Sequence, residues 1–228
     1  MLIKGLQKLT LLDFPERLAA TVFVGGCNFR CPFCHNASLV IGAGAGEEIV
    51  EEEFFEYLSS RVGRLTGVCV SGGEPTMQPG LEDFIRRIRA LGFAVKLDTN
   101  GYRPEVLRAL IDDGLLDYVA MDIKSSKEGY GKCAGLEKID LSKIEESVRL
   151  LMSGRVDFEF RTTVVKELHT EEDIRSMGEW LAGDERFYLQ TFRDSGDILG
   201  SGYSAHSEEQ MKKMLEILRK YAPRAELR

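Results

Sequence analysis

The sequence of 228 residues lacks any apolar run long enough to cross a membrane, and it has no stripe of basic residues. Its first eight residues lack the apolar core of a secretory signal peptide. The formal net charge is −7 at pH 7, which disfavours a nucleic-acid partner because phosphate binding depends on clustered Lys and Arg. We therefore expect a cytoplasmic protein that binds neither a membrane nor a nucleic acid.

Cysteine is scarce, with five in the chain, yet three of them fall within the eight positions 27–34, directly after the apolar run 18–24. This odd number, and the absence of a pairing pattern at Cys69 and Cys133, argue against a disulfide framework. The side chains at positions 27, 31 and 34 are instead interpreted as metal ligands. Thiols poised for metal also belong in a reducing compartment.

Two kinds of metal centre remain for these three thiols. A structural zinc site needs four ligands, and only His35 could serve as a local fourth. Clustered thiolates suit an iron–sulfur cluster better. A four-iron cluster held by three cysteines keeps one iron free for a substrate or cofactor, and such a cluster suits anaerobic metabolism. A structural metal knuckle stays open as the alternative.

Strand-like and helix-like segments alternate along the chain, which predicts an α/β fold with parallel strands covered by helices. The expected strands are Leu18–Val24, Val68–Val70, Phe93–Leu97, Tyr118–Ile123, Phe158–Val165 and Phe187–Thr191. The expected helices are one that contains positions 50–58 and five that cover about 80–91, 104–113, 142–152, 171–182 and 207–221. Six strand–helix units predict a partial (β/α)6 TIM-like barrel, two units short of a full barrel, with an open side that suits a bulky substrate.

No internal repeat or linker divides the chain, so we expect a single domain over residues 1–228. It would consist of a lead-in strand and turn (1–17), a core (18–192) and a C-terminal tail with a last helix (193–228). The glycine-rich segment 41–46 predicts a mobile loop. The acidic run after it takes on helical spacing at Val50, Phe54, Phe55 and Leu58.

Chemically able side chains follow several of the expected strands, where parallel α/β folds gather their reacting groups. Gly72-Gly73-Glu74-Pro75 follows the second strand, and paired glycines let a backbone approach a ligand closely. An ordinary turn is the alternative for this element. Asp98-Thr99-Asn100 ends the third strand, Asp122-Ile123-Lys124 ends the fourth, and Arg161 lies inside the fifth.

The spacing Cys27-x-x-x-Cys31-x-Phe33-Cys34 resembles the signature of the radical S-adenosylmethionine (SAM) superfamily. The resemblance implies a [4Fe–4S] cluster held by these three cysteines, with SAM bound at the free iron. It also implies an oxidoreductase that cleaves SAM reductively to a 5′-deoxyadenosyl radical. The cofactor then supplies the difficult chemistry while the protein orients it.

The resemblance also assigns roles at the strand ends. The element Gly72–Pro75 would hold the methionine amino group of SAM. The third and fourth strand ends are similar to those of pyruvate formate-lyase activating enzyme, which implies that Asp98, Thr99 and Asp122 face a monovalent cation and that Lys124 approaches SAM. The full cofactor-binding set implied in this way is Phe33, Gly72, Gly73, Glu74, Pro75, Asp98, Thr99, Asn100, Asp122, Lys124, Arg161 and Gln190.

Each of these assignments has a simpler alternative. Asp98 could form an N-cap or Asx turn, and Lys124 could be a solvated surface lysine. Arg161 could form a salt bridge within the barrel instead of binding SAM, since an unpaired buried charge is costly.

The remaining candidates have weaker patterns. Gln190 and Phe192 could frame the adenine or the substrate entrance, although plain packing suits Phe192 equally. Cys69 is interpreted as a small core residue, His35 as a hydrogen-bonding neighbour of the cysteines, and Cys133 lies in a glycine-rich loop, 129–135, with no readable role. His169 and His206 receive no role.

Absences narrow the branch of the superfamily. No further cysteine set lies between Cys34 and Gly72, and no cysteine lies beyond Cys133, which disfavours relatives with auxiliary clusters. The compact chain, with Leu12-Asp13-Phe14-Pro15 ahead of the cysteines, most resembles the anaerobic ribonucleoside-triphosphate reductase activating proteins. Their pattern continues with glycine after that proline, where this chain has Glu16.

This branch implies a protein substrate. The radical would abstract hydrogen from a backbone glycine of a glycyl radical enzyme, with a flavodoxin- or ferredoxin-like protein as electron donor. Three competitors remain: activation of pyruvate formate-lyase or another glycyl radical enzyme, small-molecule radical chemistry as in the deazapurine-forming relatives, and a non-catalytic iron–sulfur carrier.

Overall fold

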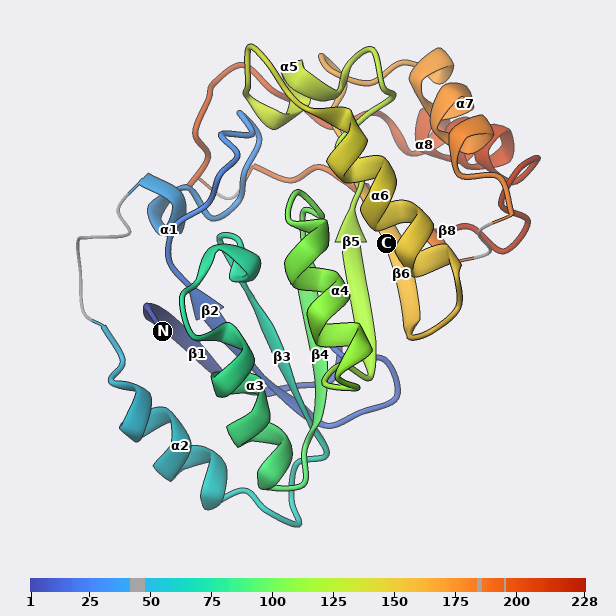
Figure 1. Cartoon of the computed structure of the whole chain (residues 1–228). Helices are drawn as coiled ribbons and strands as arrows, with labels where there is room; N and C mark the ends of the chain where they lie inside the picture. The colour runs from blue at the N-terminus through green and yellow to red at the C-terminus, as the bar shows by residue number, and fades with distance from the viewer. Residues whose placement is uncertain (42–47, 184–185, 195) are drawn as a thin grey trace.

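A computed structural model describes residues 1–41, 48–183, 186–194 and 196–228. Its strands form one eight-stranded sheet in chain order (Figure 1). The first pair is antiparallel and every later pair is parallel. The strands are β1 (Ile3–Thr10), β2 (Ala19–Val24), β3 (Gly67–Gly72), β4 (Ala94–Thr99), β5 (Tyr118–Asp122), β6 (Asp157–Val164), β7 (Phe187–Thr191) and β8 (Glu226–Leu227).

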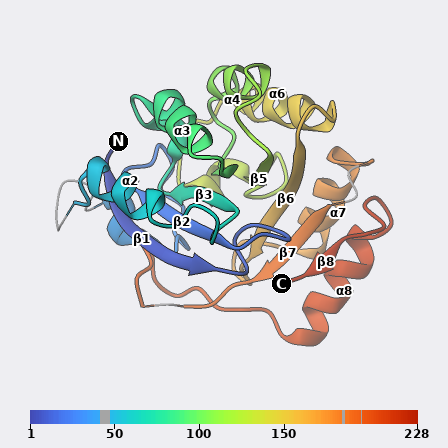
Figure 2. The ribbon, with the colours of Figure 1, turned by 90° about the horizontal axis from the view of Figure 1, so that it is seen from below.

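The six predicted strands correspond to β2 through β7, so the predicted α/β fold with parallel strands is confirmed. Within the described residues β1 and β8 do not pair, and the curved sheet stays open with helices along its outer side (Figure 2). The central strands are buried almost continuously, as expected for parallel strands covered on both faces.

The longer helices each bury an apolar face. In α3, Leu81, Phe84, Ile85 and Ile88 recur at helical spacing and are all buried. The helices are α1 (Ala37–Ile41), α2 (Glu51–Ser59), α3 (Leu81–Ala90), α4 (Pro104–Asp112), α5 (Tyr130–Ala134), α6 (Leu141–Met152), α7 (Glu171–Trp180) and α8 (Glu208–Leu218), with a 3₁₀ turn η1 (Pro75–Met77). None of the described helices is both long and apolar enough to cross a membrane.

Side-chain caps explain where the later helices begin. Thr170 and Asp173 form a reciprocal capping box at the start of α7. The side chains of Asp140 and Ser207 accept hydrogen bonds from backbone N–H groups in the first turns of α6 and α8. These local signals account for the close agreement between the predicted and observed starts of the three helices.

The prediction of a loop over 129–135 was wrong, because residues 130–134 form α5. Tyr130 and Cys133 are fully buried there, so tertiary packing overrides the low helix propensity of the flanking glycines. Gly135 ends the helix with a φ of +67°, a conformation that favours glycine. Two further short elements, α1 and β8, were not predicted, and the loop predicted over 41–46 lies beyond Ile41 outside the described residues.

The lead-in strand is confirmed as β1, and the turn that follows it lies at the amino ends of the parallel strands. Phe14 packs there against Ala19 and Tyr118, the first residues of β2 and β5. The carboxyl ends of the same strands are left for the site described below.

Glu16 lies in this turn with a φ of +61°, the only positive φ of a residue other than glycine in the described part of the chain. A left-handed conformation costs a residue with a Cβ about 1–2 kcal/mol, whereas glycine adopts it freely. The position is the one at which the activating proteins resembled by this sequence have glycine.

We expect Glu16→Gly to raise the free energy of unfolding by about 0.5–1 kcal/mol, because the relief of strain exceeds the extra chain entropy of glycine. Urea denaturation of the full chain measures this gain. Glu16→Ala keeps the Cβ and serves as the control, so it should not be stabilising. Equal stabilities for the glycine and alanine variants would contradict the argument.

Candidate active site

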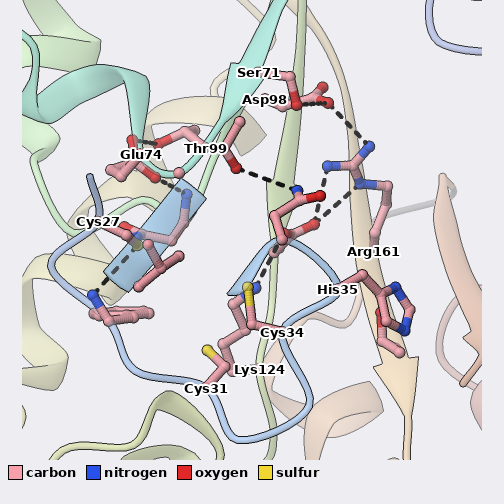
Figure 3. Close-up of a pocket in the computed structure, with 18 of the residues that line it drawn as sticks. Cys27, Cys31, Cys34, His35, Ser71, Glu74, Asp98, Thr99, Lys124 and Arg161 are labelled. Carbon is pink, nitrogen blue, oxygen red and sulfur yellow. Dashed lines mark hydrogen bonds and ion pairs between the residues drawn. The ribbon is translucent and has the colours of Figure 1, made fainter. Parts of the chain in front are cut away.

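A cavity of about 430 Å³ opens at the carboxyl ends of the parallel strands (Figure 3). This volume lies within the range of small-molecule sites. The turn before β2, the loop after β2, α1 and the ends of β3 to β7 contribute residues that line it, and these include every predicted site residue except Pro75. The lining members of the predicted set are Cys27, Cys31, Phe33, Cys34, Gly72, Gly73, Glu74, Asp98, Thr99, Asn100, Asp122, Lys124, Arg161 and Gln190.

The loop that carries the cysteines is held in place by backbone hydrogen bonds to three separate segments. Gly25 N–H donates to Leu2 at 2.9 Å, and Gly26 N–H donates to Leu39 at 2.8 Å. Arg30 N–H donates to the carbonyl of Ala134, near the end of α5, at 2.9 Å. The loop geometry is therefore set by the protein itself, with α1, α5 and the N-terminus as supports.

The three cysteines are free thiols that face one cavity. Burial raises the pKa of Cys27 to about 11 and that of Cys31 to about 12. Metal binding requires the thiolate form, which burial disfavours at these positions. A bound metal centre would supply the positive charge that stabilises the thiolates.

The donor set fits a cluster better than a single ion. Among the described residues, no three His, Cys, Asp or Glu side chains converge as they would around one metal ion. Cysteines that each bind a different iron of a cluster need not converge in this way. The buried amide nitrogen of Asn28, beside Cys27, finds no hydrogen-bond acceptor in the described part of the chain, so a donor is left for a bound group.

The paired glycines at the end of β3 pack against the protein backbone. A Cβ on Gly72 would lie 2.3 Å from the nitrogen of Val24, and one on Gly73 would lie 2.0 Å from the oxygen of Gly26. Gly73 N–H donates to Val24 and Glu74 N–H donates to Gly26, each at 2.8 Å. Gly72 therefore closely approaches the neighbouring strand β2, and Gly73 closely approaches the loop after β2, which holds the residue before Cys27 against the end of β3.

Glu74 is buried and ties the ends of β3 and β4 together. Its carboxylate accepts from the Thr99 hydroxyl and from the Asn100 N–H, each at 2.7 Å. Thr76 donates to it through both its N–H, at 3.0 Å, and its hydroxyl, at 2.5 Å. Burial raises the pKa of Glu74, and these hydrogen bonds oppose that rise. Pro75 lies outside the cavity, where it begins η1.

Five charged side chains alternate in sign across the barrel interior, and we call them the charge ladder: Lys96, Asp98, Arg161, Asp122 and Lys124. Arg161 lies between the two carboxylates, 3.5 Å from Asp98 Oδ2 and 3.0 Å from Asp122 Oδ1 (Figure 3). Lys96 binds the other oxygen of Asp98, and Lys124 lies 3.0 Å from the other oxygen of Asp122.

The ladder keeps its members ionised. Burial alone would raise the pKa of Asp122, but the charges of Lys124 and Arg161 outweigh it and hold that pKa at about 2. Burial likewise opposes the charge on Lys124, but Asp122 and Cys31 raise the pKa of its ammonium group. The cavity thus presents charged groups at neutral pH, with Lys124 close to the thiols.

The ladder bears on three alternatives that the sequence left open. Arg161 forms salt bridges within the barrel and also lines the cavity, so its contact with SAM stays a prediction. Asp98 binds Ser71, Lys96 and Arg161, and these contacts replace the Asx turn considered for it. The side chain of Lys124 is 17% exposed and paired, so it is not a solvated surface lysine.

The aromatic residues near the cavity have mainly packing contacts. The ring of His35 stacks on that of Phe192, with centroids 5.5 Å apart. Phe192 is buried and does not line the cavity, which agrees with the packing alternative, whereas Gln190 does line it. Phe33 meets the ring of His169 edge-on at 6.1 Å.

Several residues of the site were missed by the sequence analysis. Asp13 lines the cavity from the turn before β2 and accepts from the Thr21 hydroxyl at 2.6 Å. Lys96 is buried in β4, two residues before Asp98 and therefore on the same face of the strand. A lysine inside an apolar strand was a signal that could have identified it.

His169 was also missed, and no local pattern marks it. Val165 N–H donates to its Nδ1 at 3.0 Å, so Nε2 carries the proton and donates to the Lys124 carbonyl at 2.8 Å. His169 thus holds the backbone of Lys124 in place through this hydrogen bond. Cys69, by contrast, is a fully buried core residue, as expected, with Lys96 Nζ 3.8 Å from its sulfur.

Comparison with known proteins agrees with this site. The family model of the radical SAM superfamily matches residues 21–181. A Methanocaldococcus jannaschii protein, provisionally named a glycyl-radical enzyme activating enzyme, is 31% identical over 96% of this chain and 92% of its own. A 7-carboxy-7-deazaguanine synthase of Koribacter versatilis is 29% identical over 66% of this chain and 63% of its own.

A solved structure shows the same fold. Streptococcus suis SuiB, bound to the precursor peptide SuiA, superposes with a TM-score of 0.70 at 13% identity. The match covers 92% of this chain and 46% of SuiB, so this chain spans about half the length of that protein. At this identity the likeness concerns the fold alone.

Proposed function

This chain belongs to the radical SAM superfamily, and from that premise we propose that it is an activase that cleaves SAM reductively and forms a glycyl radical on a partner enzyme. The reaction would consume one electron and SAM, transfer a hydrogen atom from a backbone glycine to the 5′-deoxyadenosyl group, and release methionine and 5′-deoxyadenosine. Among possible partners we favour anaerobic ribonucleoside-triphosphate reductase.

The observation that carries the proposal is the extent of the similarity to the activating-enzyme relative, which covers nearly the whole of both chains. The compact single-cluster pattern and the Leu12–Pro15 segment favour the ribonucleotide reductase branch. Because the sheet is open, we propose that a loop of the partner enzyme reaches the cavity at the carboxyl ends of the strands.

The proposal gives roles to the residues of the cavity. Cys27, Cys31 and Cys34 would hold a [4Fe–4S] cluster, which when bound supplies the electron for SAM cleavage. Lys124 and Arg161 would face the SAM carboxylate, since they are the cationic side chains that line the cavity. The scheme requires no general base.

The segment 72–75 keeps the role of holding the SAM amino group as a prediction. Its backbone and the fully bonded Glu74 form a rigid edge of the cavity beside Cys27. Gln190, on the opposite strand β7, remains a candidate for adenine contact. A flavodoxin- or ferredoxin-like protein is proposed as the electron donor.

Anaerobic reconstitution with iron and sulfide, followed by reduction with dithionite in the presence of SAM, tests the activity. We expect 5′-deoxyadenosine and methionine, and a glycyl-radical signal in electron paramagnetic resonance when anaerobic ribonucleoside-triphosphate reductase is added. A reductase variant with alanine in place of its radical glycine is the matched control and should give no such signal. A protein that takes up iron but never cleaves SAM would be an iron–sulfur carrier, contrary to the proposal.

A second candidate is radical chemistry on a small heterocycle, which the similarity to the deazaguanine synthase favours. It would be supported by SAM cleavage that depends on the small molecule and not on any glycyl radical enzyme. Radical transfer to pyruvate formate-lyase in preference to the reductase would keep the activase and change its partner.

A further inference from the structure

The carboxylates predicted to bind a monovalent cation already have side-chain partners. Asp98 Oδ1 binds the ammonium of Lys96, and its Oδ2 accepts from the Ser71 hydroxyl at 2.9 Å and faces Arg161 at 3.5 Å. Asp122 Oδ1 accepts from Arg161, and its Oδ2 accepts from Lys124, each at 3.0 Å. All four carboxylate oxygens therefore contact a donor from the protein.

The third predicted ligand of the cation is also engaged elsewhere. The Thr99 hydroxyl donates to Glu74 at 2.7 Å and accepts from the Gly101 N–H at 3.1 Å. Glu74 belongs to the turn after β3, whereas Asp98 and Asp122 belong to the ladder. The three predicted ligands thus belong to two separate hydrogen-bond networks. Their oxygens do not form one set that is free to coordinate a cation.

Lys96 adds a positive charge next to Asp98. It is 1% exposed, and its neighbours in β4, Val95 and Leu97, are fully buried. An ammonium group there would be unstable without a counterion, so its contact with Asp98 accounts for its presence. Because residues two apart share a face of a strand, Lys96 reaches the barrel interior from directly beneath Asp98.

The charges of the ladder leave no deficit for a metal cation to fill. It contains three cationic side chains against two carboxylates, an excess of one positive charge. Another cation among these groups would raise that excess in a poorly solvated place, at a large electrostatic cost. The carboxylate group of a bound ligand, in contrast, would offset that charge locally.

We propose that Lys96 and Arg161 take the place of the monovalent cation in this chain, so that Asp98 and Asp122 are held by protein groups and SAM binds without a requirement for K⁺ or Na⁺. Lys96 is then a positioning residue that acts through Asp98. The inference rests on the proposed function in one respect only, which is that the ligand facing the ladder is SAM.

Melting temperatures of the full chain in KCl, NaCl and choline chloride, at equal ionic strength, test this proposal. The wild-type protein should melt at the same temperature in all three salts. Lys96→Met removes the ammonium at similar size and opens a place for a cation, so K⁺ or Na⁺ should raise its melting temperature by about 2–4 °C over choline. Lys96→Arg keeps the charge and should be as insensitive as the wild type.

Binding of SAM to the reconstituted protein gives the second readout, and its affinity should be the same in KCl and in choline chloride. A wild-type protein whose melting temperature or SAM affinity rises with K⁺ or Na⁺ overturns the proposal. A Lys96→Met variant that folds but ignores the cation overturns the role of Lys96. If that variant fails to fold, the wild-type comparison still decides.

These outcomes are separate from those that test the proposed function. The melting experiment requires neither SAM cleavage nor a partner protein. A protein whose melting temperature does not depend on the cation, but which never cleaves SAM, would contradict only the proposed activase function. An active protein that requires K⁺ or Na⁺ would contradict only the proposal that Lys96 and Arg161 replace the cation.

Discussion

Replacement of any one of Cys27, Cys31 and Cys34 by alanine is expected to abolish cluster incorporation and, with it, all detectable SAM cleavage. Each thiol would bind a different iron, and among the described residues no other cysteine lines the cavity to replace it. Iron and sulfide content after anaerobic reconstitution, together with visible absorbance, measures the cluster, and 5′-deoxyadenosine measures cleavage. Far-UV circular dichroism establishes that each variant is folded.

Cys69→Ser is the matched control for these substitutions. Cys69 is buried in mid-strand, outside the cavity, and its sulfur lies 3.8 Å from Lys96 Nζ, which can donate to a serine oxygen. We expect this variant to keep the cluster and measurable activity, with a stability loss of about 1–2 kcal/mol for the buried hydroxyl. Loss of the cluster in Cys69→Ser, to the same degree as in the other three, would show that the ligands are misassigned.

Gly73→Ala is expected to lower the rate of SAM cleavage on the order of 100-fold, the loss that a displacement of about 1 Å can cause at a reacting centre. The new Cβ would lie 2.0 Å from the backbone oxygen of Gly26, which no side-chain rotation can relieve. The loop must move, and Cys27 follows Gly26 directly. The measurement is 5′-deoxyadenosine formation by the reconstituted variant, normalised to its iron content.

Gly80→Ala separates this steric effect from ordinary glycine strain. Gly80 precedes α3 with a φ of +76°, and a Cβ there would meet nothing within 4 Å. The substitution should cost about 1 kcal/mol of stability for the left-handed conformation and leave cleavage near the wild-type rate. If Gly73→Ala were as active as Gly80→Ala, the packing between the two loops would not control the site.

The same packing changes the interpretation of the Gly72-Gly73 pair. Sequence reasoning assigned the glycines to close approach of a ligand, and the structure adds a requirement that holds before any ligand binds. The loop after β2 and the turn after β3 are in backbone contact, so the positions of the cysteines and of Glu74 are fixed relative to one another. A bound cofactor would meet a cavity edge that is already formed.

The sequence by itself determined the order of strands and helices and the presence of three clustered thiols. Strand and helix spacing are local properties, and β2 through β7 were predicted for that reason. The motif Cys27–Cys34 is equally local, because its chemistry depends on spacing within one loop. The charged residues Asp98, Asp122 and Arg161 were identifiable because each interrupts or ends an apolar strand.

The tertiary structure alone decided how those charges pair and what supports the loop. Arg161 on β6 meets Asp98 on β4, with β5 between the two strands in the sheet, and no sequence spacing encodes that distance. His169 supports Lys124 across 45 residues, and the backbone of Arg30 bonds to Ala134 across more than a hundred. Such contacts depend on sheet order and curvature, which bring distant segments together only after the chain has folded.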